Sequence, residues 1–389
     1  MPFPLLLLFQ INMIKKTVQK EIIHFFELIG KPKMFTKSAF TQSRAKLKPK
    51  AYYDLNETLI EEFYADKEIK LWEGFRLIGI DGSSIILPNS KEIIAEFGVA
   101  KNQSKSVAPM AKISTCFDIL NQMIIDPIII PYKKSEYDMM LEHIKKLKKE
   151  DLLIFDRGYS AIWVFLLLIR AKIDFLIRIP TCIFKDFWEN ESKSTIKRIE
   201  TCSEKSKITI KKRRLKFKRF NIRLIKVFLE NGETEVLATS LMDDRKYPDD
   251  IFKNLYMMRW DVEGNYNHLK NHLEVENFSG KTIIAIKQDF YANAFIENIR
   301  SLLAQDANEE VKGKKKNAKY EYKVNRNLSL GLMKDEIVKL LMSDDPNYYR
   351  KIEKLFTIEP VPIRPNRHVK RIFSYPRGKR YHMNYRRSL

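Results

Sequence analysis

Residues 256–270 read Tyr-Met-Met-Arg-Trp-Asp-Val-Glu-Gly-Asn-Tyr-Asn-His-Leu-Lys, and four side chains in this stretch have an informative spacing. Steps of three, four and seven residues separate Tyr256, Arg259, Glu263 and Lys270. At about 100° per residue, an α-helix places all four on one face. A solvated helix mixes charges all round, and a core helix carries apolar residues at these steps. The pattern instead predicts a helix with a metal-binding carboxylate between cations that reach for phosphates.

Two more carboxylates follow short apolar runs typical of buried strands. Asp81 follows Leu77-Ile78-Gly79-Ile80, and Asp156 follows Leu152-Leu153-Ile154-Phe155. A strand end holds a carboxylate rigidly, and the glycines that come next, Gly82 and Gly158, allow a ligand to approach closely. Strands also end in Asp simply because Asp suits turns. The order Asp, Asp, Glu is more specific than either Asp alone.

Together these blocks resemble the catalytic blocks of DDE transposases of the insertion-sequence 4 family, over roughly residues 35–389. The resemblance lies in Asp81-Gly82-Ser83-Ser84, Phe155-Asp156-Arg157-Gly158-Tyr159 and the Tyr256, Arg259, Glu263, Lys270 string. Supporting strings are Leu237-Ala238-Thr239-Ser240-Leu241, Arg259-Trp260, Pro365-Asn366-Arg367 and Asn384-Tyr385-Arg386. Gly264 departs from the pattern, because glycine within a helix costs about 1 kcal/mol relative to alanine.

The resemblance implies a ribonuclease H-like core and an enzyme that cuts and pastes its own insertion sequence. Asp81, Asp156 and Glu263 would be the catalytic residues and would hold two Mg²⁺ (or Mn²⁺) ions, with Asp81 bridging them. Tyr256, Arg259 and Lys270 would grip phosphates beside the scissile bond. The expected partners are double-stranded DNA, both terminal inverted repeats and target, and a second copy of the chain in a paired-end homodimer.

Composition also favours a nucleic-acid partner. The chain has 389 residues, 44% of them hydrophobic, and a formal net charge of +22. Such a charge favours binding to a polyanion. A membrane surface is the competing partner, but no long basic amphipathic helix accompanies the charge. With no CxxC pair among Cys116, Cys182 and Cys202, we expect reduced, mostly buried thiols. No export signal is evident, so the expected location is cytoplasmic, in association with a prokaryotic nucleoid.

The pattern of apolar and polar residues predicts an α/β fold and divides the chain into four segments. The core should be a ribonuclease H-like mixed sheet flanked by helices. The N-terminal segment is either a DNA-binding unit or a helical brace on the core. The segments are 1–65, helical; 66–180 plus 236–300, the catalytic core; 181–235, a β-rich basic insertion; and 301–389, a linker, a helix over 333–342 and a basic tail.

The core pattern predicts the order β-β-β-α-β-α-β. Strands over 113–120 and 123–130 should pair across an Asn121-Gln122 turn. Amphipathic helices are expected over 136–149 and 160–172, and a strand over 175–179. Pro248 should open the helix that carries Glu263 and closes the core.

Two segments are strongly basic. Nine Lys or Arg and no acidic residue lie between Lys205 and Arg219, and the same holds for Val361–Leu389. Within the insertion, 208–220 and 222–229 alternate apolar and basic residues and lead to an Asn231-Gly232 hairpin turn. Lys211, Lys212, Arg213 and Arg214 are therefore candidate DNA contacts. The aromatic residues in the tail suit stacking as well as phosphate contact, although a solvated tail has similar composition.

Other functions fit less well. His268 and His272 are spaced for zinc, but a zincin needs His-Glu-x-x-His and position 269 is Leu. Neither a P-loop nor a Ser-His-Asp order stands out. A generic nuclease with the same core is another alternative, but the tail and the N-terminal segment argue against it, because simple hydrolysis needs no extra recognition of DNA ends. A catalytically inactive DNA-binding relic remains an alternative, although decay would readily remove one of the three carboxylates, which are all present.

Overall fold

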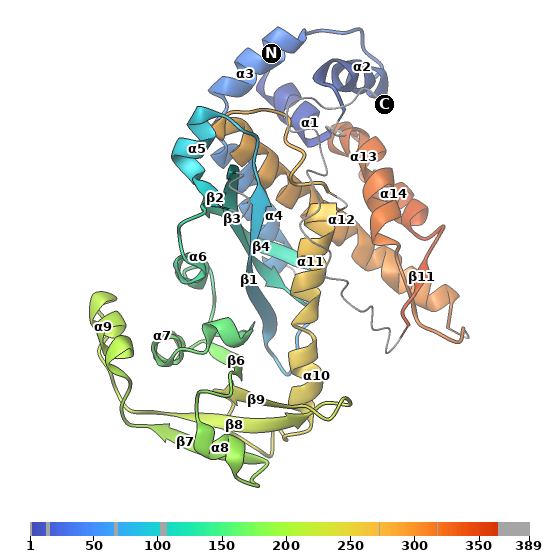
Figure 1. The fold of residues 1–389 in the computed structure, drawn as a ribbon. Helices are drawn as coiled ribbons and strands as arrows, with labels where there is room; N and C mark the ends of the chain where they lie inside the picture. Colours follow the sequence, from blue (N-terminus) through green and yellow to red (C-terminus); the bar gives the residue numbers. More distant parts are fainter. Residues whose placement is uncertain are drawn as a thin grey trace.

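A computed structural model describes residues 2–12, 16–65, 69–101, 107–271, 273–316 and 318–364. Its centre is a nine-stranded sheet in the order β2-β3-β1-β5-β6-β9-β8-β7, with β4 paired to β3 (Figure 1). The strands are β1 (Arg76–Ile86), β2 (Val99–Lys101), β3 (Val107–Asp118), β4 (Met123–Pro131), β5 (Asp151–Phe155), β6 (Asp174–Ile179), β7 (Ser194–Ile199), β8 (Phe220–Phe228) and β9 (Thr234–Thr239). A small second sheet pairs β10 (Tyr322–Lys323) with β11 (Val361–Pro362).

The large sheet is mixed, with its parallel strands at the centre. Strand β1 runs parallel to β5, and β5 runs parallel to β6. On either side the pairing is antiparallel, between β1 and β3 and between β6 and β9. The expected mixed α/β sheet flanked by helices is confirmed, and it is consistent with a ribonuclease H-like core.

Helices cover both faces of this sheet (Figure 1). Because side chains alternate along a strand, Leu77 of β1 joins one apolar cluster and Ile78 joins the other. The helices are α1 (Phe3–Asn12), α2 (Val18–Leu28), α3 (Lys37–Lys46), α4 (Lys50–Ala65), α5 (Lys91–Phe97), α6 (Glu136–Ile144), α7 (Ile162–Ala171), α8 (Lys185–Glu189), α9 (Glu204–Lys212), α10 (Ile251–Met257), α11 (Trp260–Asn271), α12 (Ile283–Lys314), α13 (Arg326–Met342) and α14 (Tyr348–Phe356).

The N-terminal helices are fastened to the core by a buried charge. Arg44 of α3 is 6% exposed and forms a 2.8 Å ion pair with Asp289 of α12. The same guanidinium donates to Gln288 Oε1 at 2.7 Å and to the carbonyl of Ala285 at 3.0 Å. A basic residue used in this way supports the core rather than a ligand, so the contacts favour the brace interpretation of residues 1–65.

The alternation of apolar and basic residues over 208–220 is typical of a strand, but residues 204–212 form helix α9. Ser203 caps this helix by accepting a hydrogen bond from the Ser206 amide, and Glu204 lies in the first turn. Alternation of apolar and basic residues around Ile208 and Ile210 fits a strand, but the cap decides the local structure. The hairpin that follows is confirmed: β8 pairs with β9, and Gly232 in the turn has a φ of 83°.

The expected linker after residue 303 is also wrong, because α12 continues to Lys314. Charged side chains on this part of the helix pair along its surface. Lys312 lies 2.9 Å from Glu309, and Lys314 lies 2.5 Å from Glu310. Spacings of three and four residues support an exposed helix, so a composition typical of linkers is here compatible with helical structure.

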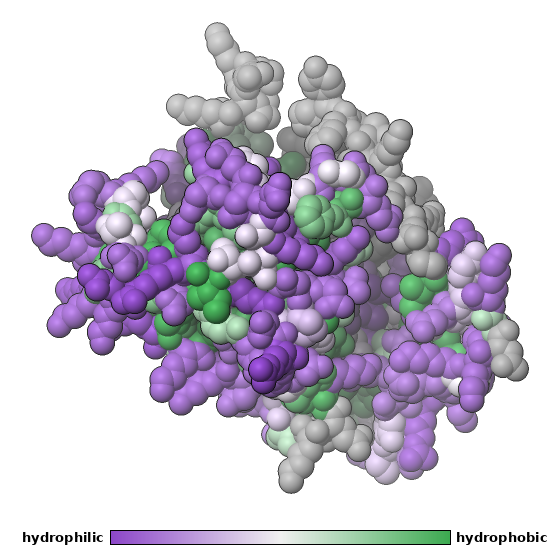
Figure 2. Space-filling model, turned by 90° about the horizontal axis from the view of Figure 1, so that it is seen from below, coloured by the Kyte–Doolittle hydropathy of each residue, from purple (hydrophilic) through white to green (hydrophobic). Residues whose placement is uncertain are grey.

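The insertion adds to the central sheet instead of forming a separate one. Strand β8 pairs with β9, which itself pairs with β6 of the core. Seen from below, the molecule is mostly hydrophilic, with small scattered apolar patches (Figure 2). No helix in the described ranges is long and apolar enough to cross a membrane. Cys116 is buried, whereas Cys182 is exposed and Cys202 is half-buried, so two of the three thiols differ from expectation.

Candidate active site

The first two predicted carboxylates lie at equivalent points of adjacent parallel strands. Gly79 of β1 is in register with Ile154 of β5, and Asp81 and Asp156 each follow two residues later. Asp156 directly follows β5, whereas β1 continues beyond Asp81 to Ile86. Parallel strands are about 4.8 Å apart, so this register places both aspartates at one edge of the sheet. Sequence spacing alone could not establish that the two strands are neighbours.

The helix with the third carboxylate is interrupted, contrary to expectation. Tyr256 lies on α10, Arg259 lies in a turn, and Glu263 and Lys270 lie on α11. Across the junction the bonds span three residues, from the Arg259 amide to Tyr256 and from the Val262 amide to Arg259, at 3.0 and 3.1 Å. The tighter turn explains the break, yet all four predicted side chains still reach the same edge of the sheet.

Close packing of α11 on β1 depends on Gly79. A Cβ atom at this position would lie 2.1 Å from Cγ2 of Val262, the residue before Glu263. Any larger residue would therefore push the helix away from the strand. Figure 1 shows α11 lying alongside β1. The sequence carries a signal for this approach, because a glycine interrupts an otherwise apolar strand run.

The surroundings of Asp81 make its ionised form less favourable than in a solvent-exposed aspartate. Burial raises its pKa to about 6, and the negative charges of Glu136 and Glu263 act in the same direction. The amide of Gly82, which donates to Asp81 Oδ1 at 2.8 Å, and the Arg259 guanidinium act in the opposite direction. A cation beside Asp81 would favour its ionised form.

The pKa of Asp156 is shifted in the opposite direction, to below its ordinary value. Burial would raise its pKa, but the amide of Arg157 and the guanidiniums of Arg178 and Arg259 hold it below the ordinary value. Arg178 of β6 donates to Asp156 Oδ1 from Nη2 at 2.8 Å and from Nε at 3.1 Å. Tyr256 donates its hydroxyl to the same oxygen at 3.4 Å. Arg178 was not singled out from the sequence, although a lone charge in the apolar run 175–179 was a usable signal.

Arg259 connects the three carboxylates electrostatically. Its Nη2 forms a 2.9 Å ion pair with Glu263 Oε1, and its charge lowers the pKa of both aspartates. The side chain of Arg259 is 8% exposed and that of Glu263 is 26% exposed. Tyr256 is buried as well. Tyr256 and Arg259, two of the three residues predicted to grip phosphate, therefore contact carboxylates in this structure, and their role in DNA binding stays a prediction.

Lys270 lies on the last turn of α11 and reaches back to β1. Its Nζ donates to Ser83 Oγ at 2.6 Å and to the carbonyl of Ser84 at 2.8 Å. The ammonium group is thus held two to three residues beyond Asp81 along the same strand. This position suits a cation that contacts a phosphate next to the one being attacked.

The carboxylates are chemically suited to hard divalent ions. The hydrogen bonds given above go to one oxygen of each carboxylate: Oδ1 of Asp81, Oδ1 of Asp156 and Oε1 of Glu263. Within the described part of the chain, no three His, Cys, Asp or Glu side chains gather around one point. Carboxylate oxygens are ligands that suit hard divalent ions such as Mg²⁺.

The predicted DNA contacts of the insertion lie at the end of helix α9 and just after it. Lys211 and Lys212 end α9, and Arg213 and Arg214 follow it. The Arg213 guanidinium lies 4.4 Å from the ring centre of Trp163 on α7. Lys212 and Arg213 also line a surface pocket of about 520 Å³ with Asp138 of α6. Of the tail Val361–Leu389, residues 365–389 are outside the described ranges.

The alternative zinc pair is not assembled by the described residues. His268 is 2% exposed and contacts Glu297 Oε2 through Nε2 at 2.8 Å. Burial lowers the pKa of His268 to about 4. His272 lies outside the described ranges. His268 is thus one member of a buried ionic cluster beneath α11.

Comparison with known proteins agrees with the geometry. The family model described as transposase DDE domain matches residues 72–299. A search of curated proteins found no match. Among solved structures, the chain is similar to a piggyBac transposase synaptic complex with hairpin DNA, at 13% identity and a TM-score of 0.37. That alignment covers 72% of this chain and 57% of the other. The chain belongs to the transposase DDE domain family.

Proposed function

We propose that this transposase belongs to the insertion-sequence 4 group and moves its own element by metal-dependent strand cleavage and strand transfer. The observation that carries the proposal is the register of Asp81 and Asp156 on adjacent parallel strands, with Glu263 on the helix packed against them. Asp81, Asp156 and Glu263 would hold two Mg²⁺ or Mn²⁺ ions. Such ions would activate the attacking oxygen and stabilise the leaving one.

The other charged residues of the site have separate tasks in this proposal. Arg178 orients Asp156, and Arg259 restrains Glu263 while balancing the negative charge of the cluster. Bound ions would supply positive charge in place of Arg259, which would then be available to contact a DNA phosphate. Lys270, which is bonded to Ser83 of β1, would contact a neighbouring phosphate. Duplex DNA with terminal inverted repeats is the proposed substrate, and a second copy of the chain is the proposed partner.

A cleavage assay tests this function. The substrate is duplex DNA with the inverted repeats expected on both sides of the reading frame. We expect strand nicking and joining with Mg²⁺ or Mn²⁺. With Ca²⁺ we expect DNA binding but little cleavage, because its longer and looser coordination misplaces the attacking oxygen. Full activity after exhaustive chelation would contradict the proposal.

The basic residues after α9 give a second prediction. Replacing Lys211, Lys212, Arg213 and Arg214 by alanine should weaken DNA binding and flatten its salt dependence. The slope of log affinity against log salt should fall by about 0.9 for each phosphate that the variant no longer neutralises. Arg213 packs on Trp163, so we expect its own contribution to be smaller than that of the exposed Lys211.

Gel shifts over a salt series provide the measurement. The matched control replaces four exposed basic residues at the end of α12, which removes the same charge from another part of the surface. Those residues are Lys312, Lys314, Lys315 and Lys316. Equal slopes for the wild type and the insertion variant would show that this segment is only a solvated surface.

A further inference from the structure

The main-chain carbonyl of Asp81 accepts two hydroxyl hydrogen bonds. Tyr266 donates its phenolic hydrogen to this oxygen at 2.6 Å, and Ser114 donates its Oγ hydrogen to it at 2.6 Å. A carbonyl oxygen has two lone pairs, so both acceptor positions are used. The backbone of Asp81 therefore cannot shift without breaking buried hydrogen bonds.

Tyr266 makes this contact from the helix that carries Glu263. It lies three residues after Glu263 on α11, so the two side chains project from neighbouring positions of the same helix. Its hydroxyl also accepts from the amide of Thr115 at 2.9 Å. Thr115 is the cross-strand partner of Asp81 between β1 and β3. One phenol thus links α11 to both strands at the level of the catalytic aspartate.

Ser114 is held in turn by two buried side chains. Its Oγ lies 2.9 Å from Nε2 of His143, and Nδ1 of that histidine lies 2.7 Å from Asp126 Oδ2. The order Asp126, His143, Ser114 resembles a hydrolase triad. However, Ser114 is fully buried and donates its hydrogen to Asp81, so it is not a nucleophile. These residues restrain the Asp81 carbonyl from β3, β4 and α6, whereas Tyr266 restrains it from α11.

We infer that the Tyr266 hydroxyl sets the distance between Asp81 and Glu263, which makes Tyr266 a positioning residue for phosphodiester cleavage. The inference rests on the function proposed above. Asp81 and Glu263 are held by different elements, a strand and a helix. The other contacts that set their separation are the packing of Val262 on Gly79 and the hydrogen bonds of Lys270 to Ser83 and Ser84, farther along the strand. Ions held between two carboxylates require a fixed separation, and a hydrogen bond from helix to strand at this point supplies it.

Tyr266→Phe in the full-length chain tests the inference, because it retains the ring and removes the hydroxyl. Tyr64→Phe is the matched control. The Tyr64 hydroxyl donates to Asp118 Oδ2 at 2.6 Å on the same strand β3, without contacting Asp81. Three quantities are measured for each: thermal stability, Mn²⁺ binding by electron paramagnetic resonance, and single-turnover DNA cleavage against Mn²⁺ concentration.

We expect both variants to lose similar thermal stability. Tyr266→Phe alone should bind Mn²⁺ about tenfold more weakly and cleave about tenfold more slowly, as loss of one net hydrogen bond predicts. DNA-end binding should be unchanged in both. If Tyr266→Phe matches Tyr64→Phe in Mn²⁺ affinity and cleavage, the inference is overturned. Should Tyr266→Phe fail to fold, Tyr266→Met carries the same test, since a flexible apolar side chain can fill the site and also lacks the hydroxyl.

Failure of this inference can be told apart from failure of the proposed function. If exchanges of Asp81 and Glu263 abolish cleavage but Tyr266→Phe behaves as its control, only the positioning role is wrong. If those exchanges leave cleavage intact, the metal-dependent function itself is wrong.

Discussion

We expect strand cleavage to slow by at least about 10³-fold when asparagine replaces Asp81 or Asp156, or when glutamine replaces Glu263. Such a loss corresponds to a rise of about 4 kcal/mol in the activation barrier. Each exchange preserves shape and removes a charge that suits Mg²⁺. The parallel register of β1 and β5 places Asp81 and Asp156 on adjacent strands. Glu263 is brought to the same strand β1 because α11 packs on Gly79. No variant should lose DNA-end binding, because the proposed phosphate contacts lie on other side chains.

Cleavage and end binding are measured on the same preparations. Asp186→Asn is the control, since Asp186 lies on α8 in the insertion and its side chain is 65% exposed. It should cleave at the wild-type rate. Near-normal cleavage by any variant of the three carboxylates would remove that residue from the catalytic set. A wild-type protein that binds ends but never cleaves, with either metal, would instead indicate an inactive relic.

Local sequence patterns correctly predicted the two strands and the helix on which the candidate site residues lie. Apolar runs before Asp81 and Asp156 marked β1 and β5, and helical spacing placed Glu263 and Lys270 on one helix. These features depend on residues close in sequence, so periodicity is sufficient to find them. The break between α10 and α11 was not predictable in this way, because no proline or glycine marks it.

Contacts between distant segments could not be predicted from spacing. Arg178 meets Asp156 from a strand 22 residues away, and Tyr266 meets Asp81 across 185 residues. Such pairs follow from sheet order and helix packing, which depend on the whole chain. The differences at α9 and the end of α12 have another origin. There, one composition fits two local structures, and a cap or surface ion pairs select the helix.

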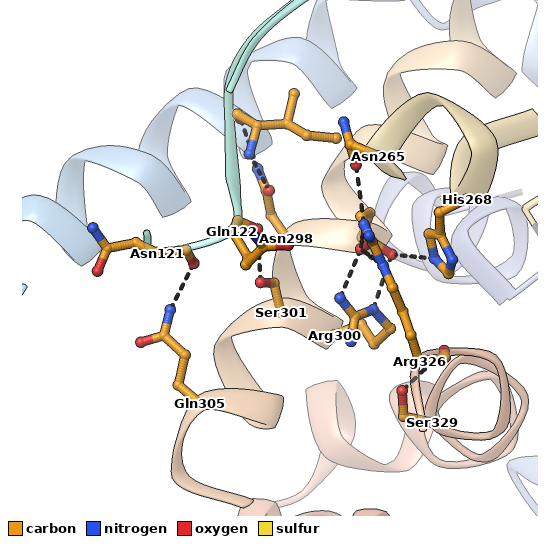
Figure 3. Close-up of polar contacts among 12 residues, drawn as sticks. Asn121, Gln122, Asn265, His268, Asn298, Arg300, Ser301, Gln305, Arg326 and Ser329 are labelled. Atoms are coloured by element: carbon orange, nitrogen blue, oxygen red, sulfur yellow. Dashed lines mark hydrogen bonds and ion pairs between the residues drawn. The ribbon is translucent and has the colours of Figure 1, made fainter. Parts of the chain in front are cut away.

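A buried ionic cluster joins α11 to α12 and α13. Glu297 of α12 is fully buried, and Arg300, Arg326 and His268 converge on it from three helices (Figure 3). Arg326 donates to it from Nη2 at 2.6 Å and also reaches Asn265 Oδ1 on α11 at 3.0 Å. Burial opposes the charged form of Glu297, but the two guanidiniums and His268 hold its pKa well below the usual range.

Glu297→Gln should therefore lower the free energy of unfolding by about 3–5 kcal/mol, because it leaves buried guanidinium charge without a counter-ion. Since the pKa of Glu297 is lower in the folded than in the unfolded chain, its contribution is complete at pH 7 and is lost only as pH falls through the folded-state value. Urea unfolding at pH 7 measures the effect. Glu309→Gln is the control, because Glu309 lies on the same helix and is 59% exposed in its pair with Lys312. This exchange should cost about 1 kcal/mol or less.

Because His268 and Asn265 lie on α11, the helix of Glu263, the Glu297 variant should also cleave more slowly under conditions where it remains folded. A loss no larger than that of the control would show that the cluster contributes little to holding α11 in place.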